Sequence, residues 1–179
     1  MIIIHMFDSV FSGGPGHIVE IDETKLGAKR KYNRGRLNPG LDTWLFGGVD
    51  RVTKKIFLRV VDDRTRNTLL PIIQENIELG TMIYSDTWAP YFTLNQNGYN
   101  HAMVNHSVEF VSDEGVCTNT IESLWSEIKA GLKIRRGFGK AQVEGYLDEF
   151  MYRRQFKLED IFEIMLVHIA EIYIVNDLE

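Results

Sequence analysis

The pattern of apolar and polar positions predicts β-strands in five short stretches of the chain. HIVEIDET (17–24) alternates, is rich in β-branched residues and follows the turn-forming SGGPG. TWLFGGVD (43–50) and KIFLRVVDD (55–63) flank the short polar segment RVTK, a pattern typical of an antiparallel hairpin. Two further apolar runs, TMIYSD (81–86) and NHAMVNHS (100–107), predict the remaining strands.

Helical spacing of apolar residues predicts two elements between these strands. Residues 65–80 follow this spacing, with Pro71 expected near the first turn, Gly80 as the stop, and apolar positions at Leu69, Leu70, Ile72, Ile73 and Ile77. Residues 87–98 predict a helix or helical turn that Gly98 closes.

Three more helices are predicted in the C-terminal third of the chain. The first begins with Thr118 or Thr120 as its N-cap, and the others cover residues 140–155 and 158–175. The apolar side of the last helix packs either in the core or against a partner. This order of strands and helices implies a mixed α/β fold, in which helices cover a mixed sheet.

Composition limits the class of protein. A chain of 179 residues with 44% hydrophobic residues is long enough for one domain with its own core. Cys117 is the single cysteine, so no internal disulfide forms, and a reducing compartment fits best. The N-terminal MIIIHMF is too short for a signal sequence, and charged residues interrupt the apolar run near the C-terminus. We therefore expect a protein that is neither secreted nor membrane-spanning.

Charge is distributed unevenly. The formal net charge of -5 argues against binding nucleic acid by bulk charge. Basic residues gather in two runs, 25–36 and 129–140, whereas the chain beyond Glu144 is mostly acidic. Each basic run is either solvated surface or a local contact for phosphates.

Three carboxylates are candidates for a metal site. Asp22 and Asp86 both lie in predicted strands, and neighbouring strands would bring them within a few ångströms of each other. Glu122 lies in the first turn of a predicted helix, which could add a third ligand to the same ions. Each acid also has an ordinary interpretation, as a strand-end residue or as an acid that the helix dipole favours.

An ordered set of segments resembles the DDE transposases of the ISXO-like bacterial insertion sequences and the related eukaryotic Merlin elements. The resemblance spans roughly residues 19–154 and is carried, in this order, by VEIDETKLGAKRKYNRGR, WLFGGVDR, FLRVVDDRTRNTLLPII, GTMIYSDTWAPY, HAMVNHSVEFV, TNTIESLWSEIK and YLDEFMYRR. It implies a ribonuclease-H-like fold, with a central mixed sheet of about five strands flanked by helices and with extra C-terminal helices.

The resemblance also implies a catalytic triad. Carried over position by position, the triad is Asp22, Asp86 and Glu122, which bind two Mg²⁺ or Mn²⁺ ions. In related families a basic residue follows the third acid by seven, and Lys129 stands at that position here (129 − 122 = 7). The implied activity is metal-dependent cleavage of DNA followed by transfer of the 3′-hydroxyl to target DNA, with Lys129 positioning a phosphate.

The implied partner is DNA, both transposon ends and target, bound by a multimer of the protein. The two basic runs then become the expected phosphate contacts, and aromatic residues near the acids either stack on unpaired bases or pack in the core. The candidate DNA-binding residues are Lys25, Lys29, Arg30, Lys31, Arg34, Trp88, Trp125, Lys133, Arg135 and Arg136. Tyr91 has the same two interpretations as the tryptophans.

The resemblance suggests a leader at 1–18, the catalytic domain at 19–156 and a C-terminal helix at 157–179. Relatives commonly carry a zinc-ribbon or helix-turn-helix segment before the catalytic domain, so end recognition is expected to come from a missing segment or a partner. Cys117 stands where many relatives have histidine. The alternatives are a domesticated, non-catalytic DNA- or protein-binding descendant and a ribonuclease-H-like nuclease. The expected location is the nucleus in a eukaryote and the cytoplasm or nucleoid in a bacterium.

Overall fold

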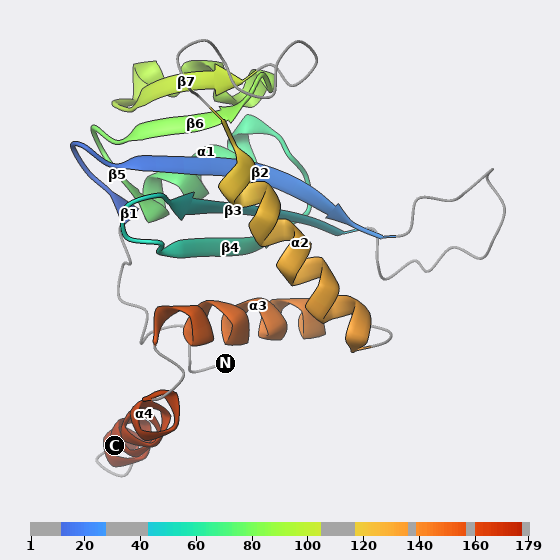
Figure 1. The fold of residues 1–179 in the computed structure, drawn as a ribbon, viewed down its shortest axis with the longest axis vertical. Helices are drawn as coiled ribbons and strands as arrows, with labels where there is room; N and C mark the ends of the chain where they lie inside the picture. Colours follow the sequence, from blue (N-terminus) through green and yellow to red (C-terminus); the bar gives the residue numbers. More distant parts are fainter. Residues whose placement is uncertain (1–11, 28–42, 105–116, 136–138, 157–159, 177–179) are drawn as a thin grey trace, which may run out of the picture.

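A five-stranded mixed sheet forms the centre of the molecule (Figure 1). The computed structural model describes residues 12–27, 43–104, 117–135, 139–156 and 160–176, with side chains described as far as Glu171. The strand order is β4-β3-β2-β6-β7. These strands are β2 (Ile18–Leu26), β3 (Thr43–Asp50), β4 (Ile56–Val61), β6 (Met82–Asp86) and β7 (Asn100–Val104). β2, β3 and β4 pair antiparallel, whereas β2, β6 and β7 pair parallel.

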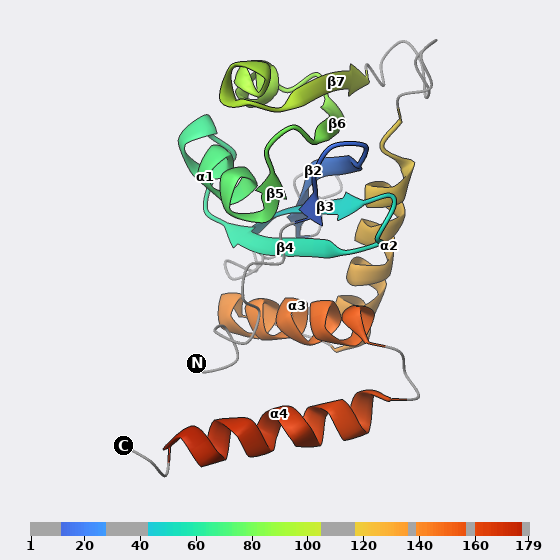
Figure 2. The ribbon, with the colours of Figure 1, turned by 90° about the vertical axis from the view of Figure 1, so that its left-hand side faces the viewer.

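Helices cover both faces of this sheet, as Figure 2 shows. On one face, α1 (Arg66–Asn76) and the 3₁₀ helix η4 (Ala89–Thr93) enclose a core that includes Val19, Ile21, Phe46 and Ile83. On the other face, α2 (Asn119–Ile134) crosses the sheet and packs with α3 (Lys140–Gln155) over Leu45, Val49 and Leu58. Alternating residues of each strand thus serve two different cores, as the period-two pattern requires.

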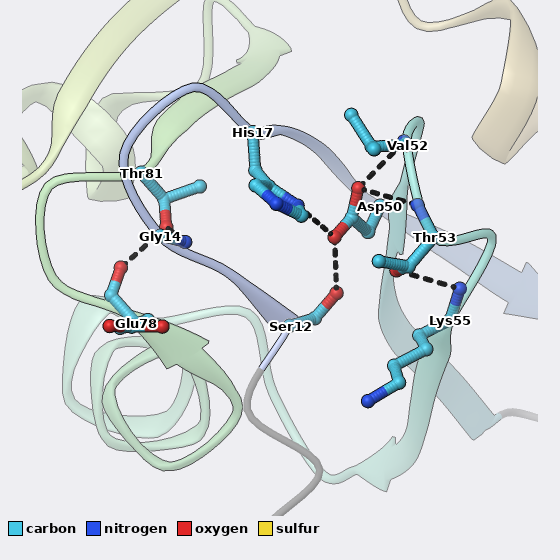
Figure 3. A network of polar contacts seen from close by, with 9 residues as sticks. All are labelled: Ser12, Gly14, His17, Asp50, Val52, Thr53, Lys55, Glu78 and Thr81. Carbon is cyan, nitrogen blue, oxygen red and sulfur yellow. Dashed lines mark hydrogen bonds and ion pairs between the residues drawn. The ribbon is translucent and has the colours of Figure 1, made fainter.

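A second, two-stranded sheet joins β1 (Ser12–Gly13) to β5 (Ile77–Glu78) in parallel. Gly13 has a φ of 110°, and a Cβ atom at this position would lie 2.2 Å from Oγ1 of Thr81, so only glycine fits without a shift. The same corner contains a polar network around Asp50, whose side chain is 0% exposed (Figure 3).

Asp50 fastens the β3–β4 turn to the start of β2. Its Oδ2 atom contacts Nδ1 of His17 at 2.7 Å and accepts a hydrogen bond from Ser12, while Oδ1 accepts the backbone N–H of Val52 (Figure 3). Burial opposes ionisation, but these hydrogen bonds and those from Thr53 lower the pKa of Asp50 below its ordinary value. The Asp50 carboxylate therefore holds together β1, the residue before β2 and the β3–β4 turn.

The five strands predicted from the sequence are confirmed as strands, the last of them as far as Val104, since residues 105–107 lie outside the described part. The predicted helices are present with some corrections. The helix predicted at 65–80 ends at Asn76, because Ile77 and Glu78 turn into β5. Pro71 lies in the second turn of α1 rather than near its first turn. The helical turn predicted at 87–98 is formed by η4 and the 3₁₀ helix η5 (Asn95–Asn97).

The last helix, α4 (Ile161–Asn176), does not pack its described apolar side chains in the core. Its exposed apolar residues are Phe162, Met165, Leu166, Val167 and Ile169. It touches α3 where His168 lies against Tyr152, with 3.1 Å between the ring nitrogen and the phenol oxygen. The core alternative for this helix is therefore wrong over the described part. In the described residues, no helix is long and apolar enough to cross a membrane.

Candidate functional site

Two of the three candidate acids lie side by side on neighbouring strands. β2 and β6 are parallel partners, and their register pairs Ile18 with Met82 and Glu20 with Tyr84, an offset of 82 − 18 = 64 residues. Asp22 and Asp86 are separated by the same 64 residues (86 − 22 = 64), so the register continued by two residues sets them opposite each other. Adjacent strands lie about 4.8 Å apart, and laterally paired residues of parallel strands face the same side. Both carboxylates therefore face α2.

Glu122, the third candidate acid, lies on α2, and a series of contacts holds this helix against β2. Glu20 accepts the backbone N–H of Ile121 at 2.9 Å, and Asp22 accepts the indole N–H of Trp125 at 2.9 Å. Farther along, the Lys129 ammonium donates to Oγ1 of Thr24 at 2.5 Å. The partners advance by two residues on the strand and by four on the helix.

Two residues of β2 and four residues of α2 span nearly the same length, which explains why three successive contacts form between the strand and the helix. Two strand residues span about 6.6 Å, and four helical residues rise about 6 Å. The helix therefore stays in contact with β2 from Ile121 to Lys129. Glu122 precedes Trp125 by three residues and Lys129 by seven, so all three share one side of the helix near the strand.

A buried ion pair fixes the first turn of α2. Glu20 is 0% exposed, and its Oε1 atom accepts from Nε of Arg51 at 2.6 Å. Arg51 also donates to the carbonyl oxygen and to Sγ of Cys117, at 2.7 and 2.8 Å. Thr118, the residue at the N-cap, makes no capping hydrogen bond through its side chain. Glu20 supplies this function from the sheet, because it binds an N–H of the first helical turn.

Electrostatic interactions link Asp22 to the two other candidate acids. The pKa of Asp22 is raised from 3.8 to about 6, mainly by burial, and the negative charges of Asp86 and Glu122 add to the rise. Hydrogen bonds from the Glu23 backbone and from Trp125 oppose it. A buried carboxylate whose pKa is raised further by two neighbouring acids is typical of a site that a cation completes.

Glu23 is a fourth acid near this group, and sequence reasoning did not include it in the site. It points to the opposite face from Asp22, where the buried phenol of Tyr91 donates a hydrogen bond to Oε1. Burial is the main cause that raises its pKa from 4.5 to about 7, with smaller contributions from Asp22 and Asp86. Alternation along β2 assigns Glu23 to the face opposite Asp22, but it does not predict that Glu23 lies close enough to Asp22 and Asp86 for their charges to affect it.

The carboxylates of Asp22, Asp86 and Glu122 suit hard divalent cations, although they are not arranged as a complete metal site. Carboxylate oxygens are the ligands that Mg²⁺ and Mn²⁺ prefer. Within the described ranges, however, no three Asp, Glu, His or Cys side chains are already gathered closely enough to hold an ion together. Asp22, Asp86 and Glu122 fit two such cations in chemistry, and they would have to move closer to share them.

The candidate DNA-binding residues fall into different environments. Trp125 is only 4% exposed and Tyr91 is fully buried, so for both the core interpretation holds and neither ring has a free face for a base. Arg135 stacks on Tyr146 and pairs with Glu149, which ties α2 to α3. Lys25 and Lys133 are exposed, and Trp88 is 36% exposed. Lys29, Arg30, Lys31, Arg34 and Arg136 lie outside the described residues.

Sequence reasoning missed the residues that position the acids. Glu20 precedes Asp22 by two residues, so the alternation of β2 already puts the two on one face. Nothing local reveals that Arg51 reaches Glu20, because Arg51 lies in the β3–β4 turn, 31 residues beyond its partner on β2. The signal that the sequence offers is Glu20 itself, an acid at a strand position that faces a helix. A charged side chain buried at such a position requires a partner.

Comparisons with known proteins agree with this architecture. The model of the ISXO2-like transposase domain matches residues 13–155. A Haemophilus influenzae protein described as an uncharacterized transposase-like protein is 32% identical over 99 residues, or 55% of this chain and 80% of that protein. The crystal structure of the catalytic core domain of BIV integrase matches with a TM-score of 0.50 and 13% identity, over 87% of this chain and 97% of that chain.

The integrase core supports the fold alone at this level of identity, and the ribonuclease-H-like fold expected from the sequence is confirmed. The family assignment rests on the match along the sequence, which covers the whole sheet and α1 to α3. The chain therefore belongs to the family of ISXO2-like transposase domains.

Proposed function

We propose that this chain is the catalytic domain of a DNA transposase, which cleaves a DNA strand and transfers the freed 3′-hydroxyl to target DNA in a metal-dependent reaction. The observation that carries the proposal is the 64-residue offset between β2 and β6, which equals the separation of Asp22 and Asp86, so that alternation assigns both acids to the face that α2 crosses. Family membership supports a reaction on DNA, and the three interacting carboxylates support the use of divalent cations.

Asp22, Asp86 and Glu122 would hold two Mg²⁺ or Mn²⁺ ions. Bound ions of this kind activate water or a 3′-hydroxyl for in-line attack on a phosphodiester and stabilise the leaving oxygen. Asp22 and Asp86 come from rigid, adjacent strands, and Glu122 comes from a helical turn that Glu20 holds against β2. Asp22 is oriented by the indole N–H of Trp125, so its carboxylate cannot rotate freely.

Lys129 positions a phosphate beside these acids. Its ammonium lies against Thr24, two residues beyond Asp22 on the same strand face, at 2.5 Å from the hydroxyl oxygen. An ammonium has three donors, so a phosphate can bind it while the hydroxyl contact persists. Lys25 and Lys133, both exposed, add positive charge beyond Thr24 on β2 and beyond Lys129 on α2.

The chain would act as a multimer that holds transposon ends and target DNA, with end recognition supplied by a further segment or a partner. The proposed domain limits remain 19–156 for the catalytic domain and 157–179 for the C-terminal helix. In a bacterium such a protein works at the nucleoid, and in a eukaryote it works in the nucleus.

Nicking and strand joining on a supercoiled plasmid in Mn²⁺ would test the proposal. Wild type is expected to nick and join, whereas Glu122→Gln and Asp86→Asn are expected to do neither while they melt at the wild-type temperature. Glu127→Gln is the matched control, because Glu127 lies on the same helix but pairs with Arg154 on α3. Calorimetry with Mn²⁺ would accompany the assay.

The outcomes separate the alternatives. Hydrolysis without any joining would indicate a ribonuclease-H-like nuclease rather than a transposase. A wild-type protein that neither binds Mn²⁺ nor cuts DNA would contradict the proposal and indicate a non-catalytic descendant. Equal activity of wild type and Glu122→Gln would refute the assignment of the third acid.

A further inference from the structure

Arg64 lies over two tryptophan rings beside the acidic site. Its Cζ atom is 3.9 Å from the ring centroid of Trp44 and 4.5 Å from that of Trp88. The three residues come from separate parts of the chain: β3, the segment between β4 and α1, and the segment after β6. The Trp88 indole N–H also donates to the carbonyl oxygen of Arg64 at 3.4 Å, which ties the two segments together.

Stacking of this kind decides what the guanidinium can bind. A planar guanidinium that stacks on aromatic rings keeps its five N–H donors in its own plane, directed away from the ring faces. Within the described part of the chain, the Arg64 guanidinium donates no hydrogen bond and forms no ion pair at close range. Its edge is thus held in one orientation and is available for an oxygen anion that takes two parallel hydrogen bonds.

The stack lies at the same end of the sheet as the acids. Trp88 follows Asp86 by two residues, and its backbone N–H binds Oδ1 of Asp86 at 3.1 Å. Trp44 pairs with Lys25 across β2 and β3, and the Lys25 ammonium lies 5.5 Å from the Trp44 ring. The charge of Arg64 also reaches Glu23, the neighbour of Asp22. Two cations and two indole rings therefore flank the carboxylates on the side opposite to α2.

We propose that Arg64, held by Trp44 and Trp88, binds a backbone phosphate of the DNA strand that enters the acidic site. The inference rests on the proposed function, because the site defines which strand is bound. A free phosphate ion is a poor occupant, since the neighbouring carboxylates repel a lone anion. A DNA strand carries a series of phosphates, so contacts at Arg64, Lys25 and Lys129 add up. Trp88 is 36% exposed, so part of its side chain is accessible to an unpaired base of the same strand.

Fluorescence anisotropy of a labelled DNA duplex, in Ca²⁺ or in EDTA so that no cleavage occurs, would test this contact over a series of salt concentrations. Arg64→Gln is expected to weaken binding roughly fivefold to tenfold and to reduce the slope of log affinity against log salt by about 1. Arg64→Lys is expected to keep the slope but to bind about threefold more weakly, because the ammonium lacks the planar fork.

Arg153→Gln is the matched control, since it removes the same charge from an exposed position on α3. It should change neither affinity nor slope. Equal binding of Arg64→Gln and Arg153→Gln would overturn the inference, as would competition by inorganic phosphate as effective as competition by unlabelled DNA. Thermal melting checks that each variant is folded.

The result can be separated from that of the proposed function. Mn²⁺ affinity of Arg64→Gln should equal that of wild type, because Arg64 touches none of the three acids assigned to the metal. A wild-type protein whose DNA binding depends on Arg64 but which never cuts DNA would refute the catalytic proposal alone. A wild-type protein that cuts DNA, with binding unaffected by Arg64→Gln, would refute only the inference about Arg64.

Discussion

Removal of Arg51 tests whether the buried ion pair under α2 matters for folding. In Arg51→Met the Glu20 carboxylate stays in the core, 0% exposed, with the Ile121 N–H as its remaining donor. The variant also loses the hydrogen bond to the carbonyl oxygen of Cys117 and the stacking on Tyr84, whose ring centroid is 4.9 Å from Cζ of Arg51.

The expected cost follows from these losses. Removing one partner of a buried ion pair costs about 3–5 kcal/mol, since the other charge is left unpaired. The lost contact with Tyr84 adds about 0.5–1 kcal/mol. A domain of this size has a free energy of unfolding of about 5–15 kcal/mol, so the variant loses between about a quarter of its stability and all of it. The double variant Glu20→Gln/Arg51→Met removes the orphan charge while the amide oxygen still accepts from Ile121, and should recover about 2 kcal/mol.

Urea unfolding of the wild type, both single variants and the double variant at one pH would measure the coupling energy. Amide hydrogen exchange at Ile121 and Glu122 would report whether the first turn of α2 opens. Arg59→Met is the control, because Arg59 is exposed and its described side-chain hydrogen bond goes to a neighbouring carbonyl oxygen. The reasoning is refuted if Arg51→Met costs no more than this control, or if the double variant is less stable than Arg51→Met.

Three further predictions concern the site and its surroundings. Trp125→Phe keeps a ring in the core but loses the indole N–H that binds Asp22, so the Mn²⁺ affinity measured by calorimetry should fall about tenfold. An unchanged affinity would show that Trp125 does not orient Asp22. Without added metal, the free energy of unfolding should decline as pH rises from about 4 to 7, because the raised pKa values of Asp22 (about 6) and Glu23 (about 7) make the folded state bind more protons than the unfolded state. Thermal melting should show a shallower decline with pH for Asp22→Asn than for wild type, and equal declines would argue against the burial of this acid. Gly13→Ala should lower the free energy of unfolding by about 1–3 kcal/mol more than Gly16→Ala, since both have positive φ but only at Gly13 would the new Cβ meet Thr81; equal losses in urea would show that the clash is relieved.

Local patterns allowed the elements to be predicted well where neighbouring residues decide them. Alternation in β2 assigns Ile21 and Asp22 to opposite faces, and the structure places Ile21 in the core under α1 and Asp22 against α2. The prediction failed at the end of α1, where apolar spacing continues past Asn76. The chain leaves the helix there because Ile77 and Glu78 pair with Ser12 and Gly13, a contact between distant segments that no local window contains.

The aromatic residues show the same limit at the site. From the sequence, Trp88, Tyr91 and Trp125 are equivalent candidates, since each follows an acid of the triad closely. The structure separates them by exposure: Trp125 and Tyr91 bind carboxylates from within the two cores, whereas Trp88 is exposed and stacks with Arg64. Burial depends on which helix covers which face, so it is a property of the assembled layers.

The sequence by itself determined the order of the five central strands and of the helices, the family and the identity of the three candidate acids, because alternation, helical spacing and ordered motifs are all recorded along the chain. Only the tertiary structure decided that β2 and β6 are parallel neighbours, with a register offset of 64 residues that matches the separation of Asp22 and Asp86. It alone revealed the Glu20–Arg51 pair beneath α2 and the stacking of Arg64 on two indole rings. The physical reason is that these contacts join residues far apart in the chain, and their energies depend on burial, which exists only once the sheet and its helices have packed.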